Sequence, residues 1–513
     1  SLQPRAMLDI ILFREDQGGD PEKVRESQRR RYADVGIVDK VIELDGAWRA
    51  CKTALDGARR ELNITQDKMK SFFKEKKAPP EELVAEKKAH DEKIAALEAE
   101  ESEKAAARDR TLATVGNLID DSVFVSDDED KNPVVSTHGE FTNEPWMLSH
   151  IDLIQMAGMA DTVKGSEVAG SRGFFLTGAG VLLNQAIVQY GLHFLGKKGY
   201  TPIHTPFFMN QSVMGKVAQL AQFDEELYKV TGEGDDKYLI ATSEQPICAY
   251  HLGEHCDPKA LPARYAGYST CFRKEAGSHG RDTLGIFRVH QFEKIEQFVV
   301  CSPEDRESWE EHERMLANSE EFYKSLGVPY RVVNIVSGAL NDAAAKKYDL
   351  EAWFPGSKAH RELVSCSNCT DYQARRLNCR YGFTGDRKGA DDKKLFAHML
   401  NSTLSATERT MCCLVENYQT PTGIRVPPVL VPYMNGTTFI PFKVPFPGKV
   451  KKGAPEPVHH VPTAEELAES QGANLAAYLE EHGVAAALTK AVDAVAKSRP
   501  ADPLAAIAQL LAG

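Results

Sequence analysis

Apolar residues recur in alternating steps of three and four positions through the segment from Ile37 to Phe72. The repeat continues for about five heptads, which is typical of a coiled-coil strand rather than of a helix in a globular core. It is carried by Ile37, Val41, Leu44, Trp48, Cys51, Leu55, Ala58, Leu62, Thr65, Met69 and Phe72. Ala78-Pro79-Pro80 follows, and proline both lacks a backbone donor and restrains the residue before it. The pattern therefore predicts a long helix that ends before a proline turn.

A second helical stretch, rich in Ala, Glu and Lys, runs from Glu81 to about Leu112. Its clearest seam residues are Leu83, Ile94 and Leu97. Two such helices joined at a proline tip predict an antiparallel hairpin over about 37–115, an arm on the order of 45 Å long at 1.5 Å per residue.

The charges of the two arm segments are opposite in sign. Residues 49–77 hold nine basic and four acidic residues, whereas residues 81–104 hold four basic and nine acidic. Opposite charges on facing helices favour the hairpin itself. The basic residues also suit contact with the phosphates of a nucleic acid, and both explanations stay open. The candidates for such contact are Arg59, Arg60, Lys68, Lys70, Lys74, Lys76 and Lys77.

Beyond the arm, helical and strand patterns are mixed. A polar, turn-rich stretch at Asp127–Pro133 predicts a linker over residues 127–140. Phe287–Val300 alternates and is rich in Phe, Val and Ile, as half-buried strands are, whereas Thr410–Tyr418 predicts a buried helix. Without regular βαβ repetition, residues 141–443 are expected to form an α+β domain built on an antiparallel sheet flanked by helices.

Both ends of the chain are set apart from this plan. Residues 1–6 precede Met7 and are expected to be a remnant of expression. Residues 444–513 are expected to form a C-terminal extension, with a Pro/Gly/Lys linker followed by Ala-rich amphipathic helices over Thr463–Leu511.

Composition restricts the class of protein. A hydrophobic content of 42% and a charged content of 27% over 513 residues are those of a globular protein of two or three domains. The net charge of -12 argues against a surface that attracts polyanions everywhere, so nucleic acid would bind a local basic region. Ten cysteines without regular spacing favour a reducing compartment. No apolar run approaches the ~18 to 20 residues that cross a bilayer, and we expect a cytoplasmic protein.

The segment Thr270–Phe298 carries the most specific chemistry. It contains Cys271–Glu275 and Arg288–Phe298, joined by a glycine-rich loop that includes Arg281, and this arrangement suits a triphosphate. If both parts are strands, alternation places Arg273 and Glu275 on one face and Phe292, Lys294 and Glu296 on another. Arginine can bind a phosphate or carboxylate with two hydrogen bonds, and an aromatic ring can stack on a purine. Taken alone, Phe-Arg-Xaa-Glu also fits an ordinary hairpin with a surface Arg–Glu pair.

As a whole, Phe272–Phe298 resembles motif 2 of the class II aminoacyl-tRNA synthetases, and specifically of the seryl-tRNA synthetases. Further motifs of that family follow in its order: Gly199–Pro206 resembles motif 1, Thr242-Ser243-Glu244 the serine-binding loop, Glu362–Asp371 the metal-and-ATP strand, and Asn401-Ser402-Thr403 with Arg409 and Glu416–Thr420 motif 3. Met7-Leu8-Asp9-Ile10 and the arm resemble the tRNA-binding domain, expected over residues 7–126. The resemblance covers about residues 7–443 and is closest to the eukaryotic cytosolic type. An insertion at Gly385–Lys394 departs from the family pattern.

The resemblance implies a serine–tRNA ligase, a cytoplasmic homodimer that contacts its second copy at Pro206. Such an enzyme activates L-serine with ATP to seryl-adenylate and pyrophosphate. It then transfers the seryl group to the 3′-terminal adenosine of tRNA(Ser), and of tRNA(Sec) where that is present. The basic arm residues, among them Arg59, Arg60, Lys68, Lys70 and Lys74, would hold the tRNA.

It also implies residue roles. Arg273 would hold the serine carboxylate and the α-phosphate, Arg409 the γ-phosphate, and these two are the expected catalytic residues. Glu275 would meet the adenine amino group, Phe292 would stack on adenine, and Glu362 and Ser365 would ligate Mg²⁺. The expected ATP-binding positions are Arg273, Lys274, Glu275, Val289, His290, Gln291, Phe292, Glu362, Leu363, Val364, Ser365 and Arg409. The expected serine-binding positions are Thr242, Ser243, Glu244, Arg273, Glu296, Asn401 and Thr403.

Several alternatives remain. The chain could be a synthetase-like RNA-binding protein that lost catalysis, or a coiled-coil interaction protein. Arg409 could pair with Glu416 at the surface. Cys366-Ser367-Asn368-Cys369, with His360 and Cys379 near in sequence, suggests zinc, but no second Cys-x-x-Cys pair lies at finger spacing and we expect no zinc.

Overall fold

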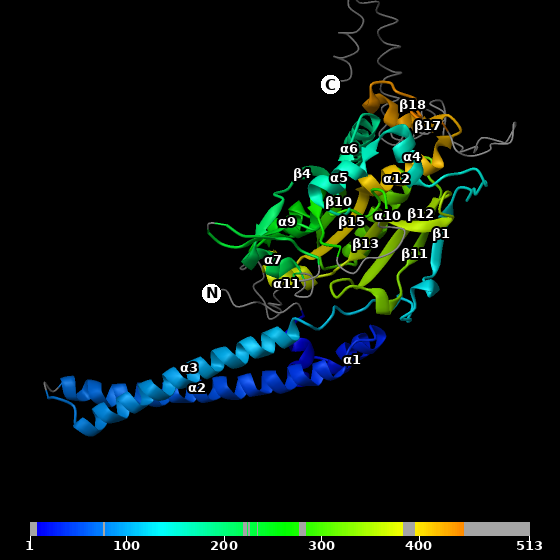
Figure 1. Cartoon of the computed structure of the whole chain (residues 1–513). Helices are drawn as coiled ribbons and strands as arrows, with labels where there is room; N and C mark the ends of the chain where they lie inside the picture. The colour runs from blue at the N-terminus through cyan, green and yellow to red at the C-terminus, as the bar shows by residue number, and fades with distance from the viewer. Residues whose placement is uncertain are drawn as a thin grey trace, which may run out of the picture. The chain divides into compact units, whose positions relative to one another are not determined.

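The arm is a hairpin of two long helices, α2 (Gly36–Lys74) and α3 (Glu81–Leu112), as Figure 1 shows. The computed structural model describes residues 8–445, except 75–76, 219–222, 224–225, 233, 276–283 and 383–394. Pro80 is the N-cap of α3, as expected of a proline turn. At 39 residues, α2 is about 58 Å long, which exceeds the expected 45 Å.

The predicted seam is the buried stripe of α2. Val41, Cys51, Leu55, Ala58 and Thr65 are all buried, and the steps between them are ten, four, three and seven positions, each of which fits a spacing of three and four. Polar contacts also cross the hairpin, because the indole nitrogen of Trp48 donates to Glu101 at 2.7 Å and the Thr65 hydroxyl donates to Glu86 at 2.9 Å. The prediction of an antiparallel helical arm is confirmed.

The base of the arm is held by short N-terminal elements and by one buried arginine. These elements are η1 (Ile10–Phe13), η2 (Glu15–Gln17) and α1 (Pro21–Arg30). Arg31 is 7% exposed and donates to the backbone carbonyl oxygens of Asn117, Asn341 and Ala344 at 3.0, 3.0 and 2.6 Å. Carbonyls that accept a cation satisfy both partners in a buried setting. Arg31 thereby connects the helical region to the segment before β12.

One large sheet organises the rest of the chain. Its strands, in spatial order, are β1 (Val134–His138), β11 (Tyr330–Asn334), β12 (Lys346–Phe354), β13 (Ala359–Asn368), β15 (His398–Ala406), β10 (Gln291–Cys301), β9 (Ala263–Phe272) and β4 (Thr201–His204). Every pairing in this sheet is antiparallel except that of β4 with β9. The predicted α+β class with an antiparallel sheet is confirmed.

Helices and small sheets cover this framework (Figure 1). The helices are α4 (His150–Ala157), α5 (Thr162–Ala169), α6 (Ala179–Lys197), α7 (Gln211–Val217), α9 (Glu244–Tyr250), α10 (Glu307–Ser325), α11 (Tyr372–Leu377) and α12 (Thr407–Asn417). The short strands are β2 (Ala160–Asp161) with β3 (Phe175–Leu176), β5 (Phe208–Asn210) with β7 (Lys237–Leu239) and β6 (Lys229–Val230), β8 (His255–Cys256) with β14 (Arg380–Tyr381), and β16 (Gln419–Thr420) with β17 (Gly423–Arg425) and β18 (Phe439–Pro441). The 3-10 turns are η3 (Glu129–Lys131), η4 (Pro258–Ala260), η6 (Ser337–Ala339) and η7 (Pro428–Met434).

Two helices pack closely on the central strands. A Cβ added at Gly191 of α6 would lie 2.5 Å from Cδ1 of Ile295 in β10, so a larger residue there would require the Ile295 side chain to shift. From α10, the backbone oxygen of Met315 and the hydroxyl of Ser319 accept from the buried Gln297 amide of β10, each at 3.0 Å. These contacts fix β10, which carries part of the candidate site.

Some expectations differ in detail or fall outside the described residues. The strand expected from Phe287 begins only at Gln291, whereas the buried helix expected over Thr410–Tyr418 is α12. Arg281, the whole insertion at Gly385–Lys394 and the helices expected over Thr463–Leu511 lie outside the described residues. Apart from residues 325–327, the described residues form one compact unit. Within them, no helix is both long and apolar enough to span a membrane.

Candidate active site

Arg273 directly follows the last residue of strand β9. Phe272 pairs with Gln291 at the end of the β9–β10 ladder, and the Arg273 amide then donates to the His290 carbonyl oxygen at 2.9 Å. Glu275 has a φ of 52°, so the chain has left the extended conformation there. The expectation that strand alternation places Arg273 and Glu275 on one face was wrong. A turn, rather than a pleat, brings both residues to the same cleft.

That cleft lies where β9, β10, β13, β15 and α12 meet. It is lined by Arg273, Glu275, Phe287, Arg288, Val289, Phe292, Lys294, Glu362, Leu363, Thr403, Ala406, Glu408 and Arg409. Eight of these were expected at a site: Arg273, Glu275, Val289, Phe292, Glu362, Leu363, Thr403 and Arg409. The fold therefore gathers residues from three separate sequence motifs around a single cavity.

Charge is concentrated around Arg409. Its guanidinium donates to the Glu362 carbonyl oxygen at 3.3 Å and lies 3.9 Å from the Glu362 carboxylate. Burial lowers the pKa of Arg409, Glu362 opposes that shift, and the neighbouring Arg273 adds to it. Desolvation tends to raise the pKa of Glu362, but Arg409, Lys347 and Arg273 together hold it below its ordinary value. Cations that repel one another in a cleft favour the entry of a polyanion.

Two phenylalanines stand beside the two arginines. The Arg273 guanidinium lies 5.3 Å from the ring centre of Phe292, and the Arg409 guanidinium lies 4.9 Å from that of Phe287. Such cation–π distances orient a guanidinium over an aromatic face. Phe287 was not singled out from the sequence, because it lies in the irregular stretch before β10.

The remaining expected ATP-binding residues are arranged around this cleft. Glu275 pairs with Arg288 and uses its backbone oxygen to accept from Arg172 at 3.1 Å. His290 and Gln291 line an adjoining cavity with Phe292, rather than the cleft itself. The Lys274 amide donates to the Glu226 carbonyl oxygen at 2.9 Å. Val364 is fully buried in β13.

The expected serine-binding residues lie deeper beside the cleft. Thr242, Ser243 and Glu244 are at the start of α9, and the Glu244 carboxylate accepts from Gln373 at 2.7 Å. Burial raises the pKa of Glu244, and the neighbouring charge of Glu296 adds to the shift. Glu296 is 1% exposed and pairs with Lys294.

Two more expected serine-binding residues come from β15. Asn401 is 9% exposed and Thr403 is 8% exposed. The Asn401 amide donates to the Cys369 sulfur at 3.5 Å, and Thr403 lines the cleft.

A second acidic residue, Asp349 of β12, lies close to Glu362 of β13. Asp349 lies directly opposite Ser365 in the β12–β13 register, and Lys347 pairs with it at 3.2 Å. Burial, together with the nearby charge of Glu362, raises the pKa of Asp349 to about 7, although Lys347 opposes the shift. Asp349 was missed from the sequence, where Lys347-Tyr348-Asp349 resembles an ordinary strand with polar residues on one face.

Glu408 is the other acidic residue that the sequence gave no reason to select. It is 4% exposed and accepts from the Glu293 amide at 3.0 Å. Burial raises its pKa to about 8. Its position next to Arg409 was the only available signal.

The alternative reading of Arg409 is wrong. Glu416 does not pair with it, because one oxygen of the Glu416 carboxylate lies 2.7 Å from Nδ1 of His150 and the other accepts from the Gly356 amide at 2.8 Å. Arg409 faces Glu362 instead.

The arm candidates and Pro206 lie away from the cleft. Arg60, Lys68 and Lys74 are exposed on α2. Arg59 pairs across the hairpin with Glu98 at 2.8 Å, and Lys70 pairs with Asp67 of its own helix at 2.7 Å. The Arg59–Glu98 pair supports the hairpin explanation of the arm charge, and contact with nucleic acid stays a prediction. Pro206 is exposed between β4 and β5.

Two family descriptions match the chain. "Seryl-tRNA synthetase N-terminal domain" matches residues 7–119, and "tRNA synthetase class II core domain (G, H, P, S and T)" matches residues 228–418. The first spans the arm and the second spans the strands and helix that build the cleft.

Named relatives extend the match to most of the chain. The serine–tRNA ligase of Helianthus annuus is 58% identical over 85% of this chain and 99% of its own length, and the cytoplasmic serine–tRNA ligase of Arabidopsis thaliana is 58% identical over 85% and 97%. The crystal structure of the cytoplasmic enzyme of Naegleria fowleri in complex with AMP is 55% identical with a TM-score of 0.76, covering 86% of this chain and all of that one. The Pyrococcus horikoshii seryl-tRNA synthetase, whose crystal structure is complexed with ATP, is 38% identical in sequence with a TM-score of 0.77. The match covers 85% of this chain and 99% of that one. The chain therefore belongs to the seryl-tRNA synthetase family of class II aminoacyl-tRNA synthetases, the serine–tRNA ligases.

Proposed function

We propose that the cleft activates L-serine with ATP and that the arm presents the tRNA that receives the seryl group. The carrying observation is that Arg273 and Arg409, from separate sequence motifs, line one cleft with Glu362, whose pKa both arginines lower. The residues of that cleft are intact, which argues against a paralogue that has lost catalysis and against a purely structural coiled-coil protein.

The first step is displacement at phosphorus. The serine carboxylate attacks the α-phosphate of ATP in line, and pyrophosphate leaves. Arg273 binds the carboxylate and the α-phosphate together, so that it holds the reactants in position and neutralises the charge that develops. Arg409 holds the γ-phosphate. Positioning and charge stabilisation account for this chemistry without a covalent nucleophile on the protein.

Adenine recognition follows from the neighbouring residues. Phe292 offers a ring for stacking, and the Glu275 carboxylate accepts from the adenine amino group. Arg288, which pairs with Glu275, orients that carboxylate.

The residues of β12 and β13 fit Mg²⁺. Glu362, Ser365 and Asp349 offer hard oxygen ligands, and the buried Oδ1 of Asp349 has no hydrogen-bond partner among the described residues. When bound, Mg²⁺ would neutralise phosphate charge. Glu362 and Ser365 would ligate it directly, and Asp349 would orient Ser365 from the facing strand.

Serine selectivity is assigned to the deeper group. Glu244 and Glu296 favour an ammonium, while Thr242, Asn401 and Thr403 offer polar groups to the serine hydroxyl. A buried site made to hydrogen-bond a hydroxyl rejects alanine, because its own polar atoms would stay unpaired.

The second step transfers the seryl group from the adenylate to the terminal adenosine of tRNA(Ser), and of tRNA(Sec) where present. The exposed basic residues of α2 hold the tRNA, and the enzyme works in the cytoplasm, as its named relatives do. It acts as a homodimer through the surface around Pro206. Large apolar side chains are exposed at Phe208 (51%), next to this surface in sequence, and earlier in the chain at Val168 (74%), Phe175 (47%) and Val181 (42%).

The decisive experiment is serine-dependent exchange of pyrophosphate into ATP. We expect exchange with serine and at least 10²-fold less with alanine, given the cost of unpaired polar groups; threonine should also exchange less, because its additional methyl group has to fit the buried site. An absence of exchange, or equal exchange with the other amino acids, would overturn the proposal. Sedimentation of the wild-type protein tests the dimer separately, because a monomeric wild type would contradict the proposed homodimer. V168E tests whether the exposed apolar side chains contribute to it.

A further inference from the structure

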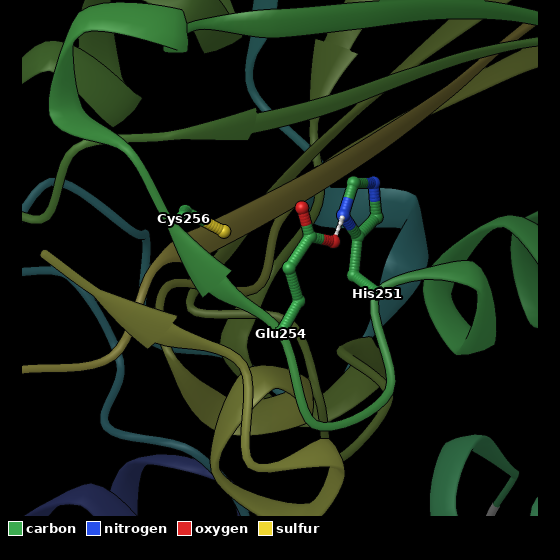
Figure 2. Close-up of side chains that lie close together, drawn as sticks. All are labelled: His251, Glu254 and Cys256. Atoms are coloured by element: carbon green, nitrogen blue, oxygen red, sulfur yellow. Dashed lines mark hydrogen bonds and ion pairs between the residues drawn. The ribbon is translucent and has the colours of Figure 1, made fainter. Parts of the chain in front are cut away.

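Four side chains with metal-binding atoms gather on the far end of α9 from the serine-binding loop. His251 and Glu254 lie in the turn after α9, Cys256 lies in β8, and Cys379 directly precedes β14. Figure 2 shows the His251 and Glu254 side chains pointing toward each other, with the Cys256 sulfur beside them. As a possible metal ligand, only Cys379 was considered from the sequence, beside the Cys366 and Cys369 pair, and the proposed reaction uses none of the four.

The metal-binding atoms of three of these side chains lie as close to one another as the ligands of one ion do. Nδ1 of His251 lies 2.5 Å from Oε2 of Glu254, and the ligand atoms of His251, Glu254 and Cys256 all lie within 4.8 Å of one another. The sulfurs of Cys256 and Cys379 are 3.5 Å apart. Two thiolates bound tetrahedrally to one Zn²⁺ at about 2.3 Å each would be roughly 3.8 Å apart. Among the described residues, His251, Glu254 and Cys256 are the one group of three or more such side chains that could share a metal ion, and Cys379 joins them through its contact with the Cys256 sulfur.

The surroundings hold the group in place. His251, Cys256 and Cys379 are 3%, 4% and 0% exposed. The parallel pairing of β8 with β14 fixes the two cysteine segments, and the Arg380 amide donates to the Glu254 carbonyl oxygen at 2.8 Å. The His251 ring packs against that of Tyr265, with 5.5 Å between centres. Only the Glu254 side chain, 47% exposed, is open to solvent, so it can adjust as an ion enters.

We infer that His251, Glu254, Cys256 and Cys379 form a binding site for a thiophilic divalent ion, namely Zn²⁺. One imidazole, one carboxylate and two thiolates make a four-coordinate set of the kind that structural zinc sites use. The expectation of no zinc was drawn from Cys366 and Cys369 and did not consider this group, because Cys256 and Cys379 are far apart in sequence. A disulfide would use the two sulfurs alone, need an oxidant, and leave the adjacent His251 and Glu254 without a role.

The site would brace the serine-binding loop. Thr242–Glu244 begins α9 and the metal group follows its other end, while Cys379 follows α11, whose Gln373 donates to Glu244 at 2.7 Å. An ion that ties the ends of α9 and α11 together would therefore limit the motion of Glu244. We expect its loss to raise the KM for serine in exchange more than it lowers kcat.

The test uses the full chain, purified without chelators or a metal-affinity column. Elemental analysis should find about one zinc per chain. After metal removal by a chelator, Co²⁺ should restore one equivalent, with the absorption of tetrahedral, thiolate-bound cobalt. Removal should also lower the Tm, on the order of 5 °C, because a ligand that binds only the folded state stabilises it.

Three variants locate the ion. C256V/C379V keeps apolar volume but removes both thiolates, and it should hold no metal. E254Q changes an exposed side chain, so it should fold normally yet bind Co²⁺ on the order of tenfold or more weakly. C366A/C369A, the alternative Cys-x-x-Cys pair, should keep the full metal content.

Four outcomes would overturn the inference. They are wild-type protein without metal that takes up no Co²⁺, metal content unchanged in C256V/C379V, metal lost only in C366A/C369A, and a Cys256–Cys379 disulfide found by non-reducing mass spectrometry of the freshly purified chain. The inference does not depend on the exchange reaction, since metal content and cobalt absorption are measured without substrates.

Discussion

The arm and the cleft are built by opposite strategies. The arm repeats one local pattern, so that each turn of α2 meets a turn of α3 in the same way along its length. The cleft uses single residues from distant positions, such as Arg273, Glu362 and Arg409, each placed by a different strand or helix. A repeat tolerates the loss of one contact, because its neighbours make the same contact. In the cleft no other residue can take over the position of a lost side chain.

The two regions also treat charge differently. In the arm, Arg59 and Glu98 form an ion pair in which both side chains are about half exposed. Around the cleft, Glu296 and Lys294 pair while almost fully buried. Exposed pairs are screened by salt and contribute little, whereas buried charges are costly to leave without a partner. Changes in the cleft should therefore have large effects on chemistry, and changes in the arm small ones on stability.

The largest effect is expected from R273A. Loss of the guanidinium should reduce serine-dependent pyrophosphate exchange by about 10³-fold or more, because it removes charge stabilisation in the transition state. Binding of tRNA in filter assays should stay within about threefold, since the arm is intact. R331A, which breaks the Arg331–Glu351 pair on outer strands of the same sheet, is the matched control and should exchange normally. Near-normal exchange by R273A would contradict its role.

Next comes removal of the arm. Replacing residues 49–104 with a short glycine-rich turn keeps Asp45 with Arg14 and Arg108 at the base. Charging of tRNA should fall by about 100-fold or more, because the phosphate contacts that dominate affinity are lost. Exchange without tRNA should stay within about twofold. If the shortened chain still charges tRNA efficiently, the arm is not the grip.

Within the arm, L55A tests the seam. Leu55 is 4% exposed, and its truncation should cost about 2–4 kcal/mol, seen as faster hydrogen exchange in α2 and α3. N63A, at an exposed position of the same helix, serves as the control. Equal acceleration of exchange in β10 would show that arm and sheet unfold as one unit, and the comparison between them would fail.

A pH effect should distinguish the cleft from the arm. Burial raises the pKa of Glu408 from 4.5 to about 8, so the fold holds a proton that the unfolded chain releases. Its contribution is fully present below about pH 4.5 and is lost as the pH rises toward 8. E408Q should reduce the fall in unfolding free energy between pH 5 and pH 8 by on the order of 2 kcal/mol, measured by urea denaturation. E98Q, on the exposed face of the arm, is the control, and an identical pH profile in E408Q would contradict the assignment.

The smallest effect on stability is expected from R59A. An exposed ion pair contributes about 0.5 kcal/mol or less, so the Tm should hardly change. If Arg59 also contacts a tRNA phosphate, the slope of log affinity against log salt should fall by about 1. An unchanged slope would assign Arg59 to the hairpin alone.

The arm could be predicted from the sequence to a greater extent than the cleft. The seam from Ile37 to Phe72 could be predicted from periodicity, because a helix pair repeats the geometry of its own local steps. The closeness of Arg409 and Glu362 could not, since it depends on how β13 meets α12, and only the resemblance to a family related them.

Other residues could be found neither from periodicity nor from the resemblance to a family. Phe287 lies in irregular backbone, and Asp349 and Glu408 are acids whose importance comes from burial, which no local pattern shows. Strand alternation gave the wrong reason for the closeness of Arg273 and Glu275, because the chain turns at Glu275. The pairing of Cys256 with Cys379 depends on the contact between β8 and β14, which the sequence does not indicate.

The seam of the arm also governs how its length can change over evolution or by design. Because residues of α2 meet α3 in steps of three and four, an insertion in one helix alone would rotate every later seam residue away from its partner. Matched insertions of seven residues in both helices would restore the contacts and lengthen the arm by about 10 Å. Its reach is therefore adjustable only in discrete increments, each close to one heptad.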